Sequence, residues 1–267
     1  MQERPLFFLS DFGTADPYAG LMKARALAEG FAGPMVDLSH GVPPQDVLRG
    51  AAILEDCLPW LPARAVVCAV VDPGVGSRRA ALAVSAGERV FVAPDNGLLT
   101  PVLQAGPDCV REIDTAALGL EVISATFHGR DVFAPVAARI ASGRLSAEEA
   151  GPAPENQPVL LDFPAVSKVN EEEWVLAVLY VDGFGNAATN LRREALPPGR
   201  AVEFFADGRL LGSLQRTYAD AAEGEPVVYV NSFGRVEVAV RGGSAAERLP
   251  LRPGAAIVMK TAGRREE

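Results

Sequence analysis

Two residues of opposite charge, Asp72 and Arg79, follow a short and entirely apolar stretch of the sequence at 65–71. A stretch of this length, rich in β-branched residues and bounded by turn formers, is typical of a strand buried on both faces. In open α/β sheets, ligands bind beyond the carboxyl ends of the strands, which is where this acid and this arginine would lie. The local sequence alone slightly favours the plainer interpretation, an Asp-Pro-Gly turn followed by a solvated arginine.

Other acids occupy similar positions. Asp11 follows a first apolar run at 6–9, and Asp16-Pro17 is predicted to supply the N-cap and first helical position of a helix over 18–29. Asp95 and Asn96 form part of an Asn-Gly turn, so they are at least as suited to shaping a loop as to holding a ligand.

Histidine is scarce, because the chain has only His40 and His128. His128 lies just before an alanine-rich helix predicted over 131–142, where the helix dipole disfavours the protonated imidazole. The position therefore favours a neutral acceptor. A histidine in a loop is nevertheless more often structural or solvated, and only its polar neighbours raise the odds of a chemical role.

The second half of the chain offers aromatic and small polar groups in turns. The sequence at 182–186 combines a carboxylate, an aromatic ring and an amide, and the stretches 218–220 and 231–234 add further aromatic rings and hydroxyl or amide groups. Such groups hold flat heterocycles by stacking and edge hydrogen bonds. Taken alone, the stretch 182–186 is better explained as a plain hairpin loop.

The elements expected to position these residues fall into two groups. Apolar strands at 6–9, 35–38 and 65–71 alternate with helices at 18–29 and 43–58. Strands are also expected at 81–84 and 90–93. This order predicts an α/β domain with a doubly wound, mostly parallel sheet.

A proline-rich connector at 151–158 precedes a change in pattern, and we expect an N-terminal domain at 1–163 and a smaller C-terminal domain at 164–267. Short strands separated by turns predict an all-β, barrel-like C-terminal domain. They are expected at 174–181, 187–191, 200–205, 209–213, 226–230, 235–240 and 255–259.

Composition narrows the classes of function. The 267 residues carry a formal net charge of −9, which argues against a nucleic-acid surface. No apolar run is long enough to span a membrane and no signal-peptide pattern begins the chain, so we predict a cytoplasmic protein. The three cysteines are expected to be reduced. Phosphate-loop, dinucleotide-binding, zinc and nucleophile-elbow motifs are absent from the sequence.

Taken together, the motifs resemble one family over nearly the whole chain and in consistent order. They are Ser-Asp-Phe-Gly at 10–13 with Asp16, Val-Asp-Leu-Ser-His at 36–40, Val-Asp-Pro-Gly-Val-Gly-Ser-Arg-Arg at 71–79, Pro-Asp-Asn-Gly-Leu-Leu at 94–99, Phe-His-Gly-Arg-Asp at 127–131, Asp-Gly-Phe-Gly-Asn at 182–186 and Asn-Ser-Phe-Gly at 231–234. This set resembles the S-adenosyl-L-methionine (SAM) hydrolases, which are also called SAM hydroxide adenosyltransferases and are relatives of the fluorinases and chlorinases.

The resemblance implies an α/β N-terminal domain, a β-barrel C-terminal domain, and a homotrimer. Substrate would lie between one subunit's N-terminal domain and its neighbour's C-terminal domain. It further implies a catalytic set of Asp72, Arg79 and His128, with Arg78 as the alternative for the arginine. No metal and no cofactor is implied, since SAM is the substrate.

The resemblance also assigns the substrate contacts. Asp11 would hold the ribose hydroxyls, and Asp16 would line the same pocket. The second-domain contacts divide into three groups: Asp182 and Ser232 for the methionine amino and carboxylate groups, Asn186 for the adenine edge, and Phe184, Tyr218 and Phe233 as further substrate-binding residues.

Comparison within this superfamily favours water as the nucleophile. The halogenases have a tyrosine at the position of Asp72 and a halide-contacting serine at the position of Gly129, and they carry an insertion that is missing here. The expected reaction is attack of water or hydroxide on ribose C5′, which yields adenosine and L-methionine.

Two alternatives of other classes stay open at this point. Asp11, Asp72, Asp95 and His128 could be ligands in a metal-dependent phosphatase, because acids at strand ends with one histidine suit a hard or borderline cation. The chain could also be a non-catalytic adenosine or SAM binder.

Overall fold

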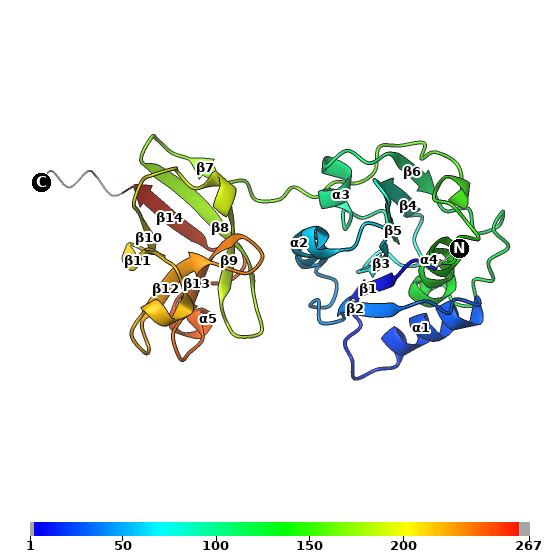
Figure 1. Ribbon diagram of the computed structural model, residues 1–267, viewed down its shortest axis with the longest axis horizontal. Coiled ribbons are helices and arrows are strands. Elements are labelled where there is room, and N and C mark those ends of the chain that lie inside the picture. The colour runs from blue at the N-terminus through cyan, green and yellow to red at the C-terminus, as the bar shows by residue number, and fades with distance from the viewer. Residues whose placement is uncertain (1–2, 262–267) are drawn as a thin grey trace, which may run out of the picture. The chain divides into compact units, whose positions relative to one another are not determined.

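The computed structural model describes residues 3–261, and the chain divides into two compact units, Met1–Asp162 and Phe163–Glu267 (Figure 1). The first unit is a mixed sheet covered by helices, and the second is built mainly of strands. Within the described part of the chain, no helix combines the length and the apolar composition needed to cross a membrane.

The sheet of the first unit has the strand order β2-β1-β3-β5-β4-β6. Its strands are β1 (Leu6–Ser10), β2 (Met35–Ser39), β3 (Val66–Val70), β4 (Ala81–Ala86), β5 (Arg89–Pro94) and β6 (Cys109–Glu112). The pairs formed by β1, β2, β3 and β5 are parallel, whereas β4 runs antiparallel to both β5 and β6. The mostly parallel sheet is therefore confirmed, with β4 as the antiparallel exception.

Helices cover both faces of this sheet, as Figure 1 shows. The helices are α1 (Tyr18–Ala28), α2 (Val47–Cys57), α3 (Thr100–Gln104) and α4 (Ala134–Ala141). Apolar residues of α1 and α4 pack with Val66, Cys68 and Val70 of β3 in one core cluster. On the other face, α2 approaches the end of β3 closely, since a Cβ at Gly50 would lie 3.0 Å from Cγ2 of Val71. Burial on both sides explains the continuous apolar sequence of β3.

One local prediction in this unit is refined and another is wrong. The helix expected over 43–58, with its start near 44–46, begins at Val47, because Gln45 has a left-handed backbone (φ 67°) and Asp46 caps the helix by accepting from the Arg49 N–H at 2.9 Å. Asp16 does not cap α1. Pro17 occupies the N-cap position and no side-chain hydrogen bond caps the helix, so the Asp16 carboxylate is not used there.

The second unit closes into a barrel, which confirms the barrel-like prediction. Around the barrel the order is β14-β10-β11-β12-β13-β9-β8, and pairing of β14 with β8 completes the circle, with β7 added outside on β8. The strands are β7 (Ser167–Lys168), β8 (Glu173–Val181), β9 (Ala187–Arg192), β10 (Val202–Ala206), β11 (Arg209–Gln215), β12 (Pro226–Val230), β13 (Arg235–Val240) and β14 (Ala256–Thr261). A short helix, α5 (Ala245–Arg248), follows β13. Closure leaves fewer free strand edges, which is how antiparallel sheets avoid exposed backbone groups.

Candidate active site

A cavity of about 420 Å³ in the first unit gathers most of the residues singled out there. It lies at the carboxyl ends of β1 and β3, which are neighbouring parallel strands with Ser10 opposite Val70. The residues that line it are Asp11, Phe12, Asp16, Tyr18, Pro44, Gln45, Val70, Asp72, Pro73, Val75, Thr126, Phe127, His128 and Gly129. Acids that are distant in sequence meet here because parallel strands end at the same edge of the sheet.

Asp72 and Arg79 form a two-point ion pair at this edge. Arg79 Nε donates to Asp72 Oδ1 at 2.8 Å, and Nη2 donates to Oδ2. The side chains are only 5% and 10% exposed. The guanidinium also lies over the ring of Phe133, 5.1 Å from its centroid. The exposed neighbour Arg78 makes no such contact, so geometry selects Arg79 over Arg78 as the partner of Asp72.

The loop between these two residues is tight, and Gly76 explains how it fits. Its φ is 79°, and a Cβ there would lie 2.8 Å from the carbonyl oxygen of Ala125. Only glycine combines this conformation with such close backbone approach. The contact brings the loop at 72–79 against the segment that carries His128.

His128 is the third residue of the expected catalytic set, beside Asp72 and Arg79. It occupies the N-cap position of a π-helical turn, η2 (Gly129–Phe133), which leads into α4. Its Nδ1 lies 3.0 Å from Nη2 of Arg79. Burial lowers the pKa of His128 below its ordinary 6.5, the positive charge of Arg79 lowers it further, and Asp72 and Asp131 act in the opposite direction. The lowered pKa favours the neutral imidazole at physiological pH.

An aromatic wall borders the cavity. The ring centroids of Phe12, Tyr18 and Phe127 lie 5.2–5.7 Å apart. Gly129 lies beside this wall, since a Cβ there would be 3.1 Å from the ring of Phe12 and 3.3 Å from that of Phe127. A serine at position 129, which the halogenases carry according to the resemblance, would require these rings to shift.

Asp11 and Asp16 lie in the same cavity with different surroundings. Asp11 Oδ2 accepts the Gln45 N–H at 2.8 Å, while Asp16 is exposed. Sequence reasoning missed Gln45, Phe12 and Tyr18 as lining residues. The Pro-Pro sequence before Gln45 was the available signal for an irregular turn at that point.

In the second unit, the turn at 182–186 and Tyr218 both lie near the end of β13. The Asp182 carboxylate accepts the N–H groups of Phe184 and Asn186, both at 2.9 Å, and the Asn186 amide at 3.1 Å. Tyr218 donates its hydroxyl to the Val240 carbonyl and accepts the Gly242 N–H, each at 2.7 Å.

Tyr229 connects these groups electrostatically. Burial raises the pKa of Tyr229 the most. The hydrogen bond to Glu237 and the charge of Glu237 raise it further, and Asp182 and Tyr218 have smaller effects in the same direction. Asp182 and Tyr218 therefore both act on the same partly buried phenol.

The remaining predicted residues of this unit are more exposed. Ser232 and Phe233 occupy the turn between β12 and β13, where the Phe233 carbonyl accepts from Arg192 at 3.0 Å. Phe184 is 83% exposed and Phe233 is 46% exposed. Phe184 therefore has most of its surface, and Phe233 nearly half of its surface, free for contact with a ligand or another chain.

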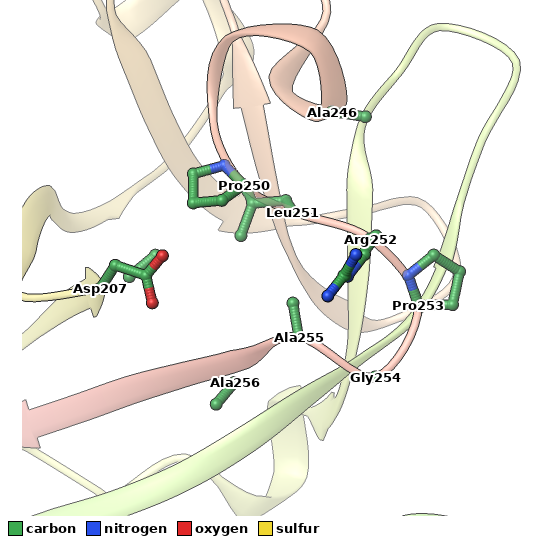
Figure 2. A pocket seen from close by; sticks show the side chains of 10 residues that line it. Asp207, Ala246, Pro250, Leu251, Arg252, Pro253, Gly254, Ala255 and Ala256 are labelled. Atoms are coloured by element: carbon green, nitrogen blue, oxygen red, sulfur yellow. The ribbon is translucent and has the colours of Figure 1, made fainter.

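A larger cavity of about 630 Å³ in the second unit contains none of the predicted residues (Figure 2). Asp207 and Arg252 are the charged side chains that line it, and the rest of its wall is alanine, proline, glycine and leucine. It lacks convergent titratable groups, so the smaller cavity of the first unit is the better candidate for chemistry.

The four residues considered as metal ligands do not form a metal site. Asp95 accepts the Val159 N–H at 2.8 Å and does not line the cavity, and both carboxylate oxygens of Asp72 are bound by Arg79. Among residues 3–261 there is no cluster of three or more His, Cys, Asp or Glu side chains suited to a metal ion. Asn96 shapes its loop by donating to the Val71 carbonyl at 2.8 Å.

Family comparisons agree with this geometry. The N-terminal and C-terminal domain models of the SAM hydroxide adenosyltransferases match residues 6–151 and 176–258. The chain belongs to the SAM hydroxide adenosyltransferase family. The match covers both units, so the recognition based on sequence motifs is confirmed.

Individual relatives support the same assignment. The chain is 46% identical to the (R)-S-adenosyl-L-methionine hydrolase of Thermus thermophilus over 94% of this chain and 97% of the relative. The hydrolase of the same name from Salinispora tropica is 43% identical over 92% and 94%. A fluorinase from Actinopolyspora mzabensis is more distant, at 27% identity over 95% and 96%.

Among solved structures, a conserved protein from Thermotoga maritima superimposes with a TM-score of 0.86 at 30% identity, covering 96% of this chain and 99% of its own. A conserved protein from Thermus thermophilus gives a TM-score of 0.76 at 40% identity, covering 97% and 100%. The fold of these two proteins therefore extends along nearly the whole chain.

Proposed function

We propose that this chain hydrolyses SAM at ribose C5′ to adenosine and L-methionine. The contact of one guanidinium with both Asp72 and His128, on the wall of a cavity that also contains Asp11, carries the proposal. Family membership and relatives named (R)-S-adenosyl-L-methionine hydrolase support it.

The main obstacle to this reaction is the weak nucleophilicity of water. The oxygen of water forms a bond to C5′ as the C5′–S bond breaks, and the electron pair of that bond leaves with sulfur as a neutral thioether. The leaving group therefore needs no general acid. Water is a weak nucleophile, so the site must hold it in line with the departing sulfur.

Hydrogen-bond directions restrict the role of His128. Arginine can only donate, so Nδ1 of His128 accepts from Arg79, and the neutral ring carries its proton on Nε2. The free ring nitrogen is then a donor that orients the water oxygen, rather than a base.

The proton of water must therefore be accepted elsewhere. The oxonium formed by attack is a far stronger acid than a carboxylic acid, so Asp72 can accept that proton although it is paired with Arg79. Each carboxylate oxygen accepts one bond from Arg79 and keeps further acceptor capacity.

A chromatographic assay tests the proposal directly. Incubation with SAM is expected to release adenosine and methionine in equal amounts, at rates unaffected by chelator or chloride. Intact SAM bound stoichiometrically would indicate a binding protein, and S-adenosylhomocysteine would indicate methyl transfer. Because the curated relatives are named for the (R) epimer at sulfur, we expect (R)-SAM to react faster than (S)-SAM.

The lowered pKa of His128 predicts the pH dependence of the reaction. Protonation at Nδ1 would place a hydrogen against the Arg79 donor, so only neutral His128 supports catalysis. Because the pKa lies below 6.5, kcat/KM should fall as the pH is lowered, with the midpoint of the fall below pH 6.5. A pH–rate profile measures this, and a midpoint above pH 6.5 would contradict it.

Substitution of Asp11 by alanine is expected to weaken binding more than turnover. The carboxylate would hold ribose hydroxyls, and losing charged hydrogen bonds of this kind costs about 2 kcal/mol, or roughly 30-fold in KM. Steady-state kinetics measures the effect. Asp108→Ala removes a surface carboxylate that binds the Gly87 N–H and serves as the control. A loss confined to kcat would assign Asp11 to the chemical step instead.

We further propose that the active enzyme is a homotrimer in which Asp182, Phe184, Asn186, Tyr218, Ser232 and Phe233 of one subunit face the cavity of a neighbour. The exposed rings of Phe184 and Phe233 support this arrangement. Cytoplasmic location stays a prediction.

Mixing two inactive variants tests the shared site. Asp72→Asn disables the first unit, while Asp182→Asn removes the charge in the second unit and can keep the two backbone hydrogen bonds of its turn. In a reassembled equal mixture, half of the subunits have an intact first unit and the other half have an intact second unit. A shared site needs one of each from neighbouring subunits, so activity should return at about a quarter of the sites. Unmixed variants assembled in the same way provide the control, and a mixture as inactive as they are would place each site within one chain.

A further inference from the structure

A second cluster of titratable residues lies beside the cavity and takes no part in the reaction proposed above. Ser10 ends β1, Asp37 lies on β2 and His40 follows β2. His40 Nδ1 lies 2.7 Å from Ser10 Oγ, and its Nε2 lies 3.0 Å from Asp37 Oδ1. Lys23 of α1 donates to Asp37 Oδ2 at 2.6 Å.

The cluster has the residue types of a nucleophilic triad, but its location argues against that role. Ser10 is fully buried and His40 is 6% exposed. Neither residue lines the cavity that contains Asp72. A nucleophile must reach its substrate, so Ser10 cannot serve as one, and the cluster needs another explanation.

The hydrogen bonds run in one direction. The Asp37 carboxylate can only accept, so the imidazole proton is on Nε2. In the neutral ring, Nδ1 then accepts from the Ser10 hydroxyl, and Ser10 Oγ in turn accepts the Phe12 N–H at 3.3 Å. Every member is satisfied, which favours a rigid arrangement.

This chain of hydrogen bonds ends on both sides of Asp11. Ser10 and Phe12 are its sequence neighbours, and both are held through Ser10 Oγ. Backbone bonds from Gly13 N–H to the His40 carbonyl at 2.7 Å and from Val42 N–H to the Ser10 carbonyl at 3.4 Å tie the same two segments together. The segment after His40 also supplies Gln45, whose N–H binds the Asp11 carboxylate at 2.8 Å.

We propose that His40, with Ser10 and Asp37, is a positioning residue that holds Asp11 in the orientation needed to bind the two ribose hydroxyls. The inference rests on the proposed function, because it takes Asp11 as the ribose-binding residue. His40 touches no substrate in this scheme and acts through the backbone on either side of Asp11.

Two nucleosides separate positioning from general stability. Adenosine carries both ribose hydroxyls, and 2′,3′-dideoxyadenosine carries neither. Calorimetric titration of folded His40→Ala should show adenosine binding weakened on the order of tenfold, about the effect of one lost hydrogen bond, and dideoxyadenosine binding unchanged. Ser10→Ala removes a single oxygen and should give the same pattern if His40→Ala does not fold. Lys168→Met breaks an exposed ion pair with Glu171, which lies outside the cluster; it is the control and should leave both affinities unchanged.

A double-mutant cycle completes the test. If His40 acts through Asp11, His40→Ala should cost nothing further in an Asp11→Ala background. If His40→Ala weakened the binding of adenosine and dideoxyadenosine equally, or if the effects in the cycle were additive, the positioning role would be overturned. Equal affinity of the wild-type protein for the two nucleosides would instead overturn the ribose role of Asp11 in the proposed function, and this inference with it.

Discussion

Asp72→Asn is expected to lower kcat by on the order of 10³-fold while adenosine affinity changes little. The amide would turn an N–H₂ group toward the guanidinium of Arg79, which now donates to both carboxylate oxygens. The water molecule would lose its proton acceptor, and Arg79 would lose the partner that fixes its contact with His128.

The same substitution should also affect stability, since it removes one partner of an ion pair whose side chains are 5% and 10% exposed. We expect the free energy of unfolding to fall by about 3 kcal/mol. Denaturant unfolding and adenosine titration therefore accompany the kinetic assay. Asp95→Asn, the same change at a carboxylate outside the cavity, is the control. Wild-type kcat in a folded Asp72→Asn protein would remove Asp72 from the mechanism.

His128→Ala is expected to lower kcat by on the order of 10²–10⁴-fold, with a much smaller effect on substrate affinity. The substitution removes the N–H that would orient the attacking water, and it leaves Arg79 Nη2 without its Nδ1 partner. Single-turnover kinetics with saturating enzyme isolates this step from product release.

His128→Gln distinguishes a donor from a base. A glutamine amide can present an N–H near the position of Nε2 but cannot accept a proton at neutral pH. If His128 is a donor, the glutamine variant should retain at least tenfold more activity than the alanine variant, and its rate should no longer fall below pH 6.5. Equal inactivity of the two variants would favour His128 as the base, and equal activity of His128→Ala and wild type would exclude both roles.

The strands and the fold class were predictable because their signals are local. Apolar β-branched runs such as 66–70 mark buried strands, and the bounds of β12 and β13 agree with the expected 226–230 and 235–240. Features that depend on long-range contacts were missed. They include the antiparallel direction of β4 and the left-handed backbone at Gln45, whose N–H binds the distant Asp11 carboxylate.

The sequence by itself determined the family and the identity of the candidate residues, because motifs spread over both units recur in fixed order. It could not decide between Arg78 and Arg79, since the two arginines are adjacent and only the folded loop shows which of them faces Asp72. Tertiary structure made that choice, because the close approach of Gly76 to Ala125 places Arg79 between Asp72 and His128. It also fixed the proton on Nε2 of His128, which no sequence pattern shows, because that position depends on a donor 49 residues away.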